Sequence, residues 1–76
     1  MQSEAERIAA GLSEREAEFL RRVCGHRPLG CADRQEDRVR QRVRRLGLVH
    51  IVKNPRRWRA LPLGLAVREV LMRPDA

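Results

Sequence analysis

Arginine dominates the stretch between Asp33 and Leu46, where it is interleaved with valine, glutamine and acidic residues. Within this stretch Val39, Val43 and Leu46 recur at i, i+4 and i+7, the spacing of the buried stripe of an amphipathic helix. Because successive helical residues are turned by about 100°, the opposite face collects polar side chains. These are Arg34, Asp37, Arg38, Gln41, Arg44 and Arg45. The stretch therefore predicts one helix with an apolar side and an arginine-rich side.

The arginine-rich side has the chemistry needed to recognise base pairs. Arginine can bond guanine through two hydrogen bonds, glutamine can do so with adenine, and aspartate can accept from cytosine, each contact contributing about 1 to 3 kcal/mol of discrimination. We expect base contacts from Arg34, Asp37, Arg38, Gln41 and Arg45, and phosphate contacts from Arg40, Arg42 and Arg44. The alternative is a solvated helix with acid pairs such as Glu36 with Arg40, but the arginines far outnumber the acids.

A basic turn follows this helix. Leu48–Val52 is apolar and rich in β-branched residues, and Trp58–Leu61 can return beside it, so the two predict a β-hairpin. Its tip is contiguous in charge with the helix, and we expect phosphate contacts from Lys53, Arg56 and Arg57. A plain solvated turn is the alternative. Trp58, the only tryptophan, is expected to pack in the core rather than to stack on a base.

The positive charge is concentrated in the middle of the chain. The 76 residues carry a net charge of +7, but residues 1–20 sum to −3 and the residues after 59 sum to zero. Residues 21–59 hold thirteen basic side chains against three acidic ones, a net of +10. Such a segment repels itself unless a polyanion neutralises it, and nucleic acid is the commonest partner of this kind. A merely solubilising surface is the alternative.

Several local signals predict the elements that position these residues. Residues 3–12 have a thin apolar stripe and predict a short helix. Ser13 and Glu16 fit a capping box, starting a helix to about Cys24 that buries Ala17, Leu20, Val23 and Cys24, with Phe19 on its flank and Gly25 at its end. After a loop over residues 25–32, Asp33 caps the arginine-rich helix, which ends at Gly47. Pro62 opens a closing helix that Pro74 ends.

Other kinds of site receive little support from the residues. Cys24, His26, Cys31 and His50 lack the tight paired spacing of a zinc site, so we expect no metal, no cofactor and free thiols. No phosphate-binding glycine loop and no nucleophile with a positioned base is present, so we do not expect an enzyme. No apolar run approaches the roughly 18 residues of a membrane span, and the N-terminus lacks the features of a signal peptide. We therefore expect a cytoplasmic, nucleoid-associated protein without membrane partners.

The order of these motifs resembles that of winged helix-turn-helix proteins of bacterial and phage transcription regulation. The resemblance rests on Arg45-Leu46-Gly47-Leu48-Val49, the basic turn, Trp58-Arg59-Ala60-Leu61 and Gly64 in a final helix. In that family a reading helix ends in such a turn and leads into a two-stranded wing that contacts DNA beside the helix.

The chain departs from the family in two places. The loop over residues 25–32 has room for only about one helical turn where the family has a whole helix. Either the motif is abbreviated, or residues 3–12 supply the missing helix. Leu61 and Pro62 stand where the family tends to place a threonine cap, so the last helix starts poorly capped.

Together these observations predict a mostly α fold with a small β-hairpin, of winged helix-turn-helix type. Residues 1–12 would form an N-terminal extension or short helix, 13–72 the domain, and 73–76 a flexible tail. The expected function is sequence-preferring binding of double-stranded DNA by a small transcriptional regulator, with a homodimer as one arrangement. The alternative functions are docking onto an acidic protein within a larger nucleoprotein assembly and, with less support, RNA binding.

Overall fold

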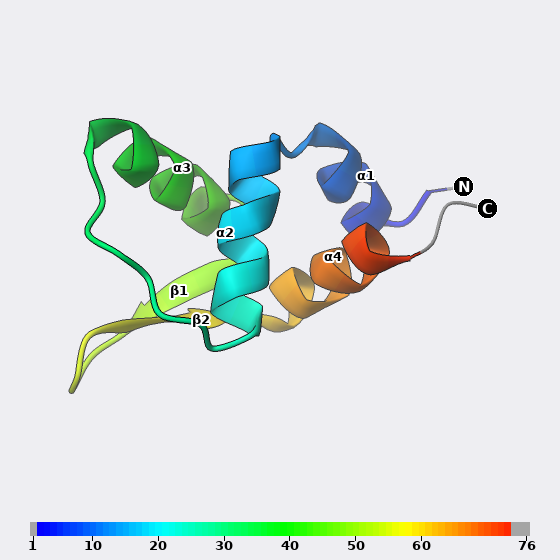
Figure 1. Ribbon diagram of the computed structural model, residues 1–76. Helices are drawn as coiled ribbons and strands as arrows, with labels where there is room; N and C mark the ends of the chain where they lie inside the picture. Colours follow the sequence, from blue (N-terminus) through cyan, green and yellow to red (C-terminus); the bar gives the residue numbers. More distant parts are fainter. Residues whose placement is uncertain (1, 74–76) are drawn as a thin grey trace.

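The computed structural model describes residues 2–73, which form four helices and one antiparallel hairpin. Their order is α1 (Glu4–Gly11), α2 (Glu14–Cys24), α3 (Arg34–Arg45), β1 (Val49–Val52), β2 (Arg57–Ala60) and α4 (Pro62–Met72) (Figure 1). The expected class, mostly α with a small β-hairpin, is confirmed. Pro74 and most of the expected tail lie outside the described residues.

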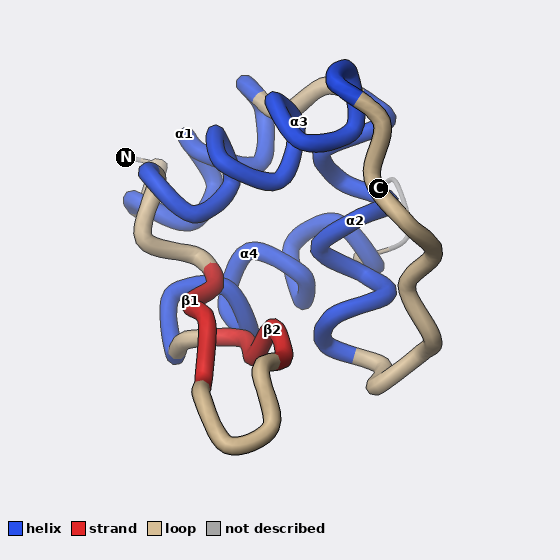
Figure 2. Tube along the Cα trace, turned by 90° about the vertical axis from the view of Figure 1, so that its left-hand side faces the viewer, coloured by secondary structure: helices blue, strands red, loops and turns tan. Residues whose placement is uncertain are grey.

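Helix α2 stands at the centre of the molecule (Figure 1). It packs against α3, β2 and α4, while α1 packs mainly against α4 on the side away from α3. After a turn of 90° about the vertical axis, α3, the hairpin and the loop over residues 26–33 lie nearest the viewer (Figure 2). That loop contains no helix, so α2 and α3 are joined by an irregular segment. The remaining helix on the N-terminal side is α1, which precedes α2 in the chain.

Side chains cap three of the helices at their N-termini. At α2 the predicted capping box is present: the Glu16 backbone N–H donates to Ser13 Oγ at 3.2 Å, and the Ser13 N–H donates to Glu16 Oε1 at 2.8 Å. Ser3 and Glu6 form the same box at α1, which was not predicted from the sequence. Asp33 Oδ1 accepts the Glu36 N–H at 2.7 Å and fixes the first turn of α3. No side chain caps α4, as its sequence predicts.

The core is built where α2, α3, the hairpin and α4 meet. Leu20, Val43, Leu48 and Val67 have no exposed surface, and Val39 and Leu46 are half-buried beside them. The apolar face predicted for α3 therefore faces the core. The expectation that Phe19 lies on a flank is wrong, because the residue is only 2% exposed. The Trp58 ring from β2 contacts it edge to face at 5.3 Å, which gives Trp58 its predicted packing role.

Helices α2 and α3 end in the same backbone motif. After α3, Gly47 has φ +80°; its N–H donates to Arg44 O at 3.0 Å, and the Leu48 N–H donates to Val43 O at 3.4 Å. After α2, the left-handed residue is not Gly25, at φ −86°, but His26, at φ 54°. The His26 N–H donates to Val23 O at 3.2 Å and the Arg27 N–H to Arg22 O at 3.0 Å. Both ends are thus Schellman closures, one with glycine and one with histidine at the left-handed position.

His26→Gly should stabilise the domain by about 0.5 to 1 kcal/mol, because glycine adopts the left-handed conformation without the Cβ crowding that penalises histidine. Thermal unfolding followed by circular dichroism measures the change. Gly47→Ala is the matched control at the equivalent position of α3, where we expect a loss of about 1 kcal/mol. Shifts of the same sign in both variants would contradict the assignment of these two closures.

Candidate nucleic-acid interface

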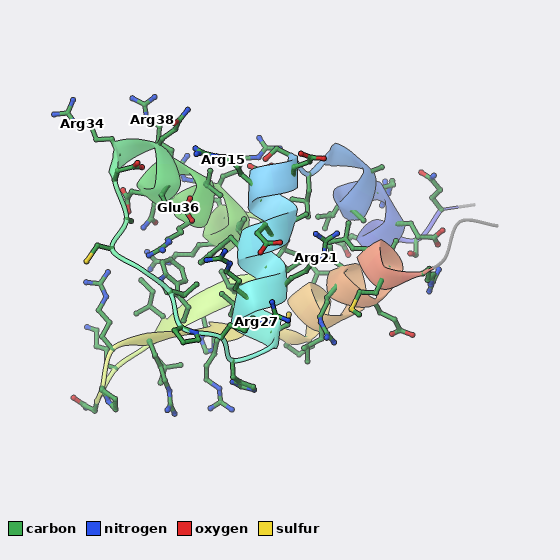
Figure 3. The ribbon with its side chains drawn as sticks, in the orientation of Figure 1. Arg15, Arg21, Arg27, Arg34, Glu36 and Arg38 are labelled. Carbon is green, nitrogen blue, oxygen red and sulfur yellow. The ribbon has the colours of Figure 1, made fainter. Side chains whose placement is uncertain are left out.

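The outward face of α3 carries arginines that are available to a partner. Arg34, Asp37, Arg38, Arg44 and Arg45 are exposed, and Gln41 is half-buried. Figure 3 shows Arg34 and Arg38 pointing away from the body of the protein. Among residues 2–73, Arg34, Arg38 and Arg45 take part in no side-chain hydrogen bond or ion pair. With Gln41 they follow the spacing i, i+4, i+7 and i+11, which places all four on one narrow stripe of the helix.

Arg40, expected to contact phosphate, points inward. Its side chain is 12% exposed; Nη2 donates to Gly30 O at 2.9 Å, and Nε lies 3.5 Å from Glu36 Oε1. The guanidinium carbon lies 5.4 Å from the centroid of the Phe19 ring. Figure 3 shows Glu36 on the inner side of α3. Arg40 therefore joins the loop before α3 to the core.

Arg42 and Arg44 are also engaged within the protein. Arg42 Nε lies 2.6 Å from Glu16 Oε2, and the Glu16 side chain is only 8% exposed. The other oxygen of Glu16 accepts the Ser13 N–H of the capping box, so one carboxylate joins the start of α2 to α3. Arg44 Nη1 donates to the amide oxygen of Gln41 at 3.4 Å. This bond orients Gln41 but leaves its amide NH₂ free of any protein acceptor among the described residues.

Arg42→Gln should destabilise the domain by about 1 to 2 kcal/mol, because the nearly buried Glu16 carboxylate would lose its cationic partner. The expected loss of stability is modest because the Arg42 side chain is 57% exposed, so water already screens the ion pair and can solvate part of the Glu16 charge in the variant. Urea unfolding measures the loss. Arg45→Gln, on the same helix but exposed, is the control and should stay within about 0.5 kcal/mol of the parent. Equal losses in the two variants would show that the Glu16 pair contributes nothing specific.

The hairpin presents its predicted basic tip to solvent. Lys53, Asn54, Arg56 and Arg57 are exposed, and Asn54 has φ 68°. The strands pair Ile51 with Trp58 and His50 with Arg59. Because side chains alternate across a strand, Trp58 packs against the core with Ile51 half-buried beside it in the sheet, whereas His50 and Arg59 are exposed on the outer face. Arg59 thus joins the basic surface; it was not assigned from the sequence, although the alternation of Trp58 and Ala60 with arginine could have predicted its exposure.

Arg27 is a second basic residue that the sequence reasoning did not assign to the interface. It follows the Schellman closure of α2 and is exposed at the end of that helix next to the hairpin (Figure 3). Its position depends on how the chain turns after Gly25 and on where the hairpin folds back. Residues 26–33 contain no periodic pattern from which the turn or the position of the hairpin could be predicted.

The cysteines and histidines do not assemble into a metal site. Over residues 2–73, no three His, Cys, Asp or Glu side chains are close enough together to hold a metal ion. Cys31, His26 and His50 are exposed, whereas Cys24 is half-buried. Burial raises the pKa of the Cys24 thiol, which the positive charge of Arg68 only partly offsets. No helix in the described part of the chain is both long and apolar enough to cross a membrane.

The candidate interface therefore combines two chemically distinct parts: arginines on α3 that have no partner among the described residues, together with an oriented amide, and an exposed basic tip on the hairpin. The first can form directional, bidentate bonds, and the second supplies positive charge at the end of a projecting element. Comparison with protein-family models, curated proteins and solved structures finds no match to this chain.

Proposed function

We propose that this protein binds double-stranded DNA with a sequence preference and acts as a small transcriptional regulator. The observation that carries the proposal is the stripe of Arg34, Arg38, Gln41 and Arg45 on α3. Three of its members are arginines that have no partner within residues 2–73, and the fourth is an amide held by Arg44. A major groove about 12 Å wide admits one α-helix, so such a stripe can meet base edges while its opposite face stays anchored by Val43.

The hairpin supports a winged arrangement. Three helices precede it, β1 begins shortly after α3, and the basic tip projects from the side of the molecule that also carries α3 (Figure 2). In the proposed complex α3 enters the major groove, while Lys53, Arg56 and Arg57 reach the flanking phosphates. Arg40 and Arg42 are left out of this list of phosphate ligands because Glu36, Gly30 and Glu16 already engage them.

A salt series with three nucleic-acid probes tests this function. Affinity for random duplex should fall linearly with salt on logarithmic axes, with a slope near −4 if about four phosphates are neutralised. Selection from a duplex pool should enrich one motif that binds at least about 10³-fold more tightly than random duplex. RNA of equal length should bind no better than random DNA, since the described surface offers a helix and not an aromatic platform for single strands. Failure to enrich any motif would reduce the protein to a nonspecific binder, and absence of duplex binding would refute the proposal.

A further inference from the structure

A basic cavity lies between the C-terminal end of α2, the loop that follows it and the hairpin. Its volume is about 540 Å³, and its polar lining consists of His26, Arg27, Arg40, Arg56 and Arg57, with Trp58 as an aromatic wall. No acidic side chain of residues 2–73 lines it. A larger groove between α2 and the start of α3, about 830 Å³, differs in this respect because glutamates and aspartate line it together with arginines. Of these two spaces, the smaller has charged side chains of one sign among the described residues.

The basic groups of this cavity come from different parts of the chain. Arg27 follows directly on the Schellman closure, where its own N–H is bonded to Arg22 O. Arg40 is fixed by Gly30 O and Glu36. Arg56 and Arg57 come from the hairpin, which the contact between Phe19 and Trp58 attaches to α2. Basic side chains from the end of α2, from α3 and from the hairpin therefore line one space.

The positive charge of the cavity favours the binding of an anion. Within residues 2–73, Arg27, Arg56 and Arg57 form no ion pair, so their mutual repulsion is not relieved by the protein itself. The planar guanidinium group matches the oxygens of a phosphate bidentately. The volume lies within the range of about 300 to 1,000 Å³ that is typical of small-ligand sites.

We propose that this cavity is a phosphate-binding site, with Arg27, Arg56 and Arg57 as its ligands. The phosphate belongs either to the backbone of a bound duplex, in which case the site rests on the proposed function, or to a free phosphorylated small molecule. Both sources present the same oxygens to the same guanidinium groups. Arg27 is the diagnostic residue, because it lies in the cavity but outside both α3 and the hairpin tip.

The first arm of the test titrates the protein with inorganic pyrophosphate at constant ionic strength. Trp58 is the only tryptophan and lines the cavity, so its emission reports occupancy directly. A free phosphorylated ligand predicts a saturable change in emission whose dissociation constant rises at least about tenfold in Arg27→Gln. Arg15→Gln is the control: it removes one exposed arginine from α2 outside this cavity and should leave the titration unchanged. Thermal unfolding establishes that both variants are folded.

The second arm measures duplex binding across a salt series with the same variants. A backbone phosphate in the cavity predicts that Arg27→Gln lowers the salt slope by about one and that Arg15→Gln does not. A positive result in either arm supports the site and identifies the source of the phosphate. If pyrophosphate fails to bind saturably and the two variants bind duplex alike, the site is refuted while DNA binding stands. If the parent binds no duplex, the proposed function fails and the pyrophosphate arm alone decides.

Discussion

Val43→Asp should leave the chain unfolded at 25 °C. Val43 has no exposed surface and lies in the core cluster with Leu20, Leu48 and Val67. An aspartate there would be ionised without a partner or would have to bury a protonated acid, and either costs several kcal/mol. A domain of this size has a total stability of only about 4 to 11 kcal/mol, so one such change removes most of it. Far-ultraviolet circular dichroism and the loss of a cooperative thermal transition measure the outcome.

Two variants separate burial of charge from a general effect on α3. Val43→Ala leaves a small cavity and should cost about 1 to 3 kcal/mol while keeping the fold. Arg38→Asp introduces the same carboxylate on the outward face of the same helix and should keep a cooperative transition. A native-like transition for Val43→Asp would mean that α3 is rotated from the orientation described, and the stripe of Arg34, Arg38 and Arg45 would lose its outward placement.

Gly64→Ala should cost at least about 3 kcal/mol, at or beyond the upper end of ordinary overpacking. A Cβ at position 64 would lie 1.9 Å from the Leu48 carbonyl oxygen and 2.8 Å from its carbon, both of them backbone atoms. That carbonyl also accepts the Leu61 N–H at 2.9 Å. It therefore cannot move away without breaking this hydrogen bond, which fixes the segment between the hairpin and α4. At about 4 to 8 °C per kcal/mol, the melting temperature should fall by roughly 12 °C or more.

Gly30→Ala is the matched control for that substitution, because nothing lies within 4 Å of the position its Cβ would occupy. Its melting temperature should stay within a few degrees of the parent. A similarly small change for Gly64→Ala would show that α4 does not approach Leu48 as closely as described.

The elements of this fold are largely readable from local sequence. The Ser13 and Glu16 capping box, the Asp33 cap, the glycine after α3 and the basic turn between two apolar stretches lie within a few residues of the structure that they determine. The outward placement of Arg34 and Arg38 follows from the spacing of Val39 and Val43 in the same way. These features can be predicted without knowing how the rest of the chain folds.

The inward arginines and the cavity could not be predicted in this way. Arg40 lies on the flank of α3, and its carbonyl partner, Gly30, belongs to a loop without periodicity. The partner of Arg42, Glu16, lies on another helix and was assigned only its capping role. Phe19 is buried because the hairpin folds back to bring Trp58 against it. In each case the position of a side chain is decided by tertiary packing.

The most direct test of the central claim, that α3 reads bases while the hairpin holds phosphates, compares Arg38→Ala with Arg57→Ala on the selected duplex and on random duplex. Arg38→Ala should lose about 1 to 3 kcal/mol on the selected site and little on random duplex. Arg57→Ala should weaken both duplexes equally and reduce the salt slope by about one. Equal losses on both duplexes for Arg38→Ala would contradict the claim, because a helix that merely adds positive charge would behave as the hairpin does.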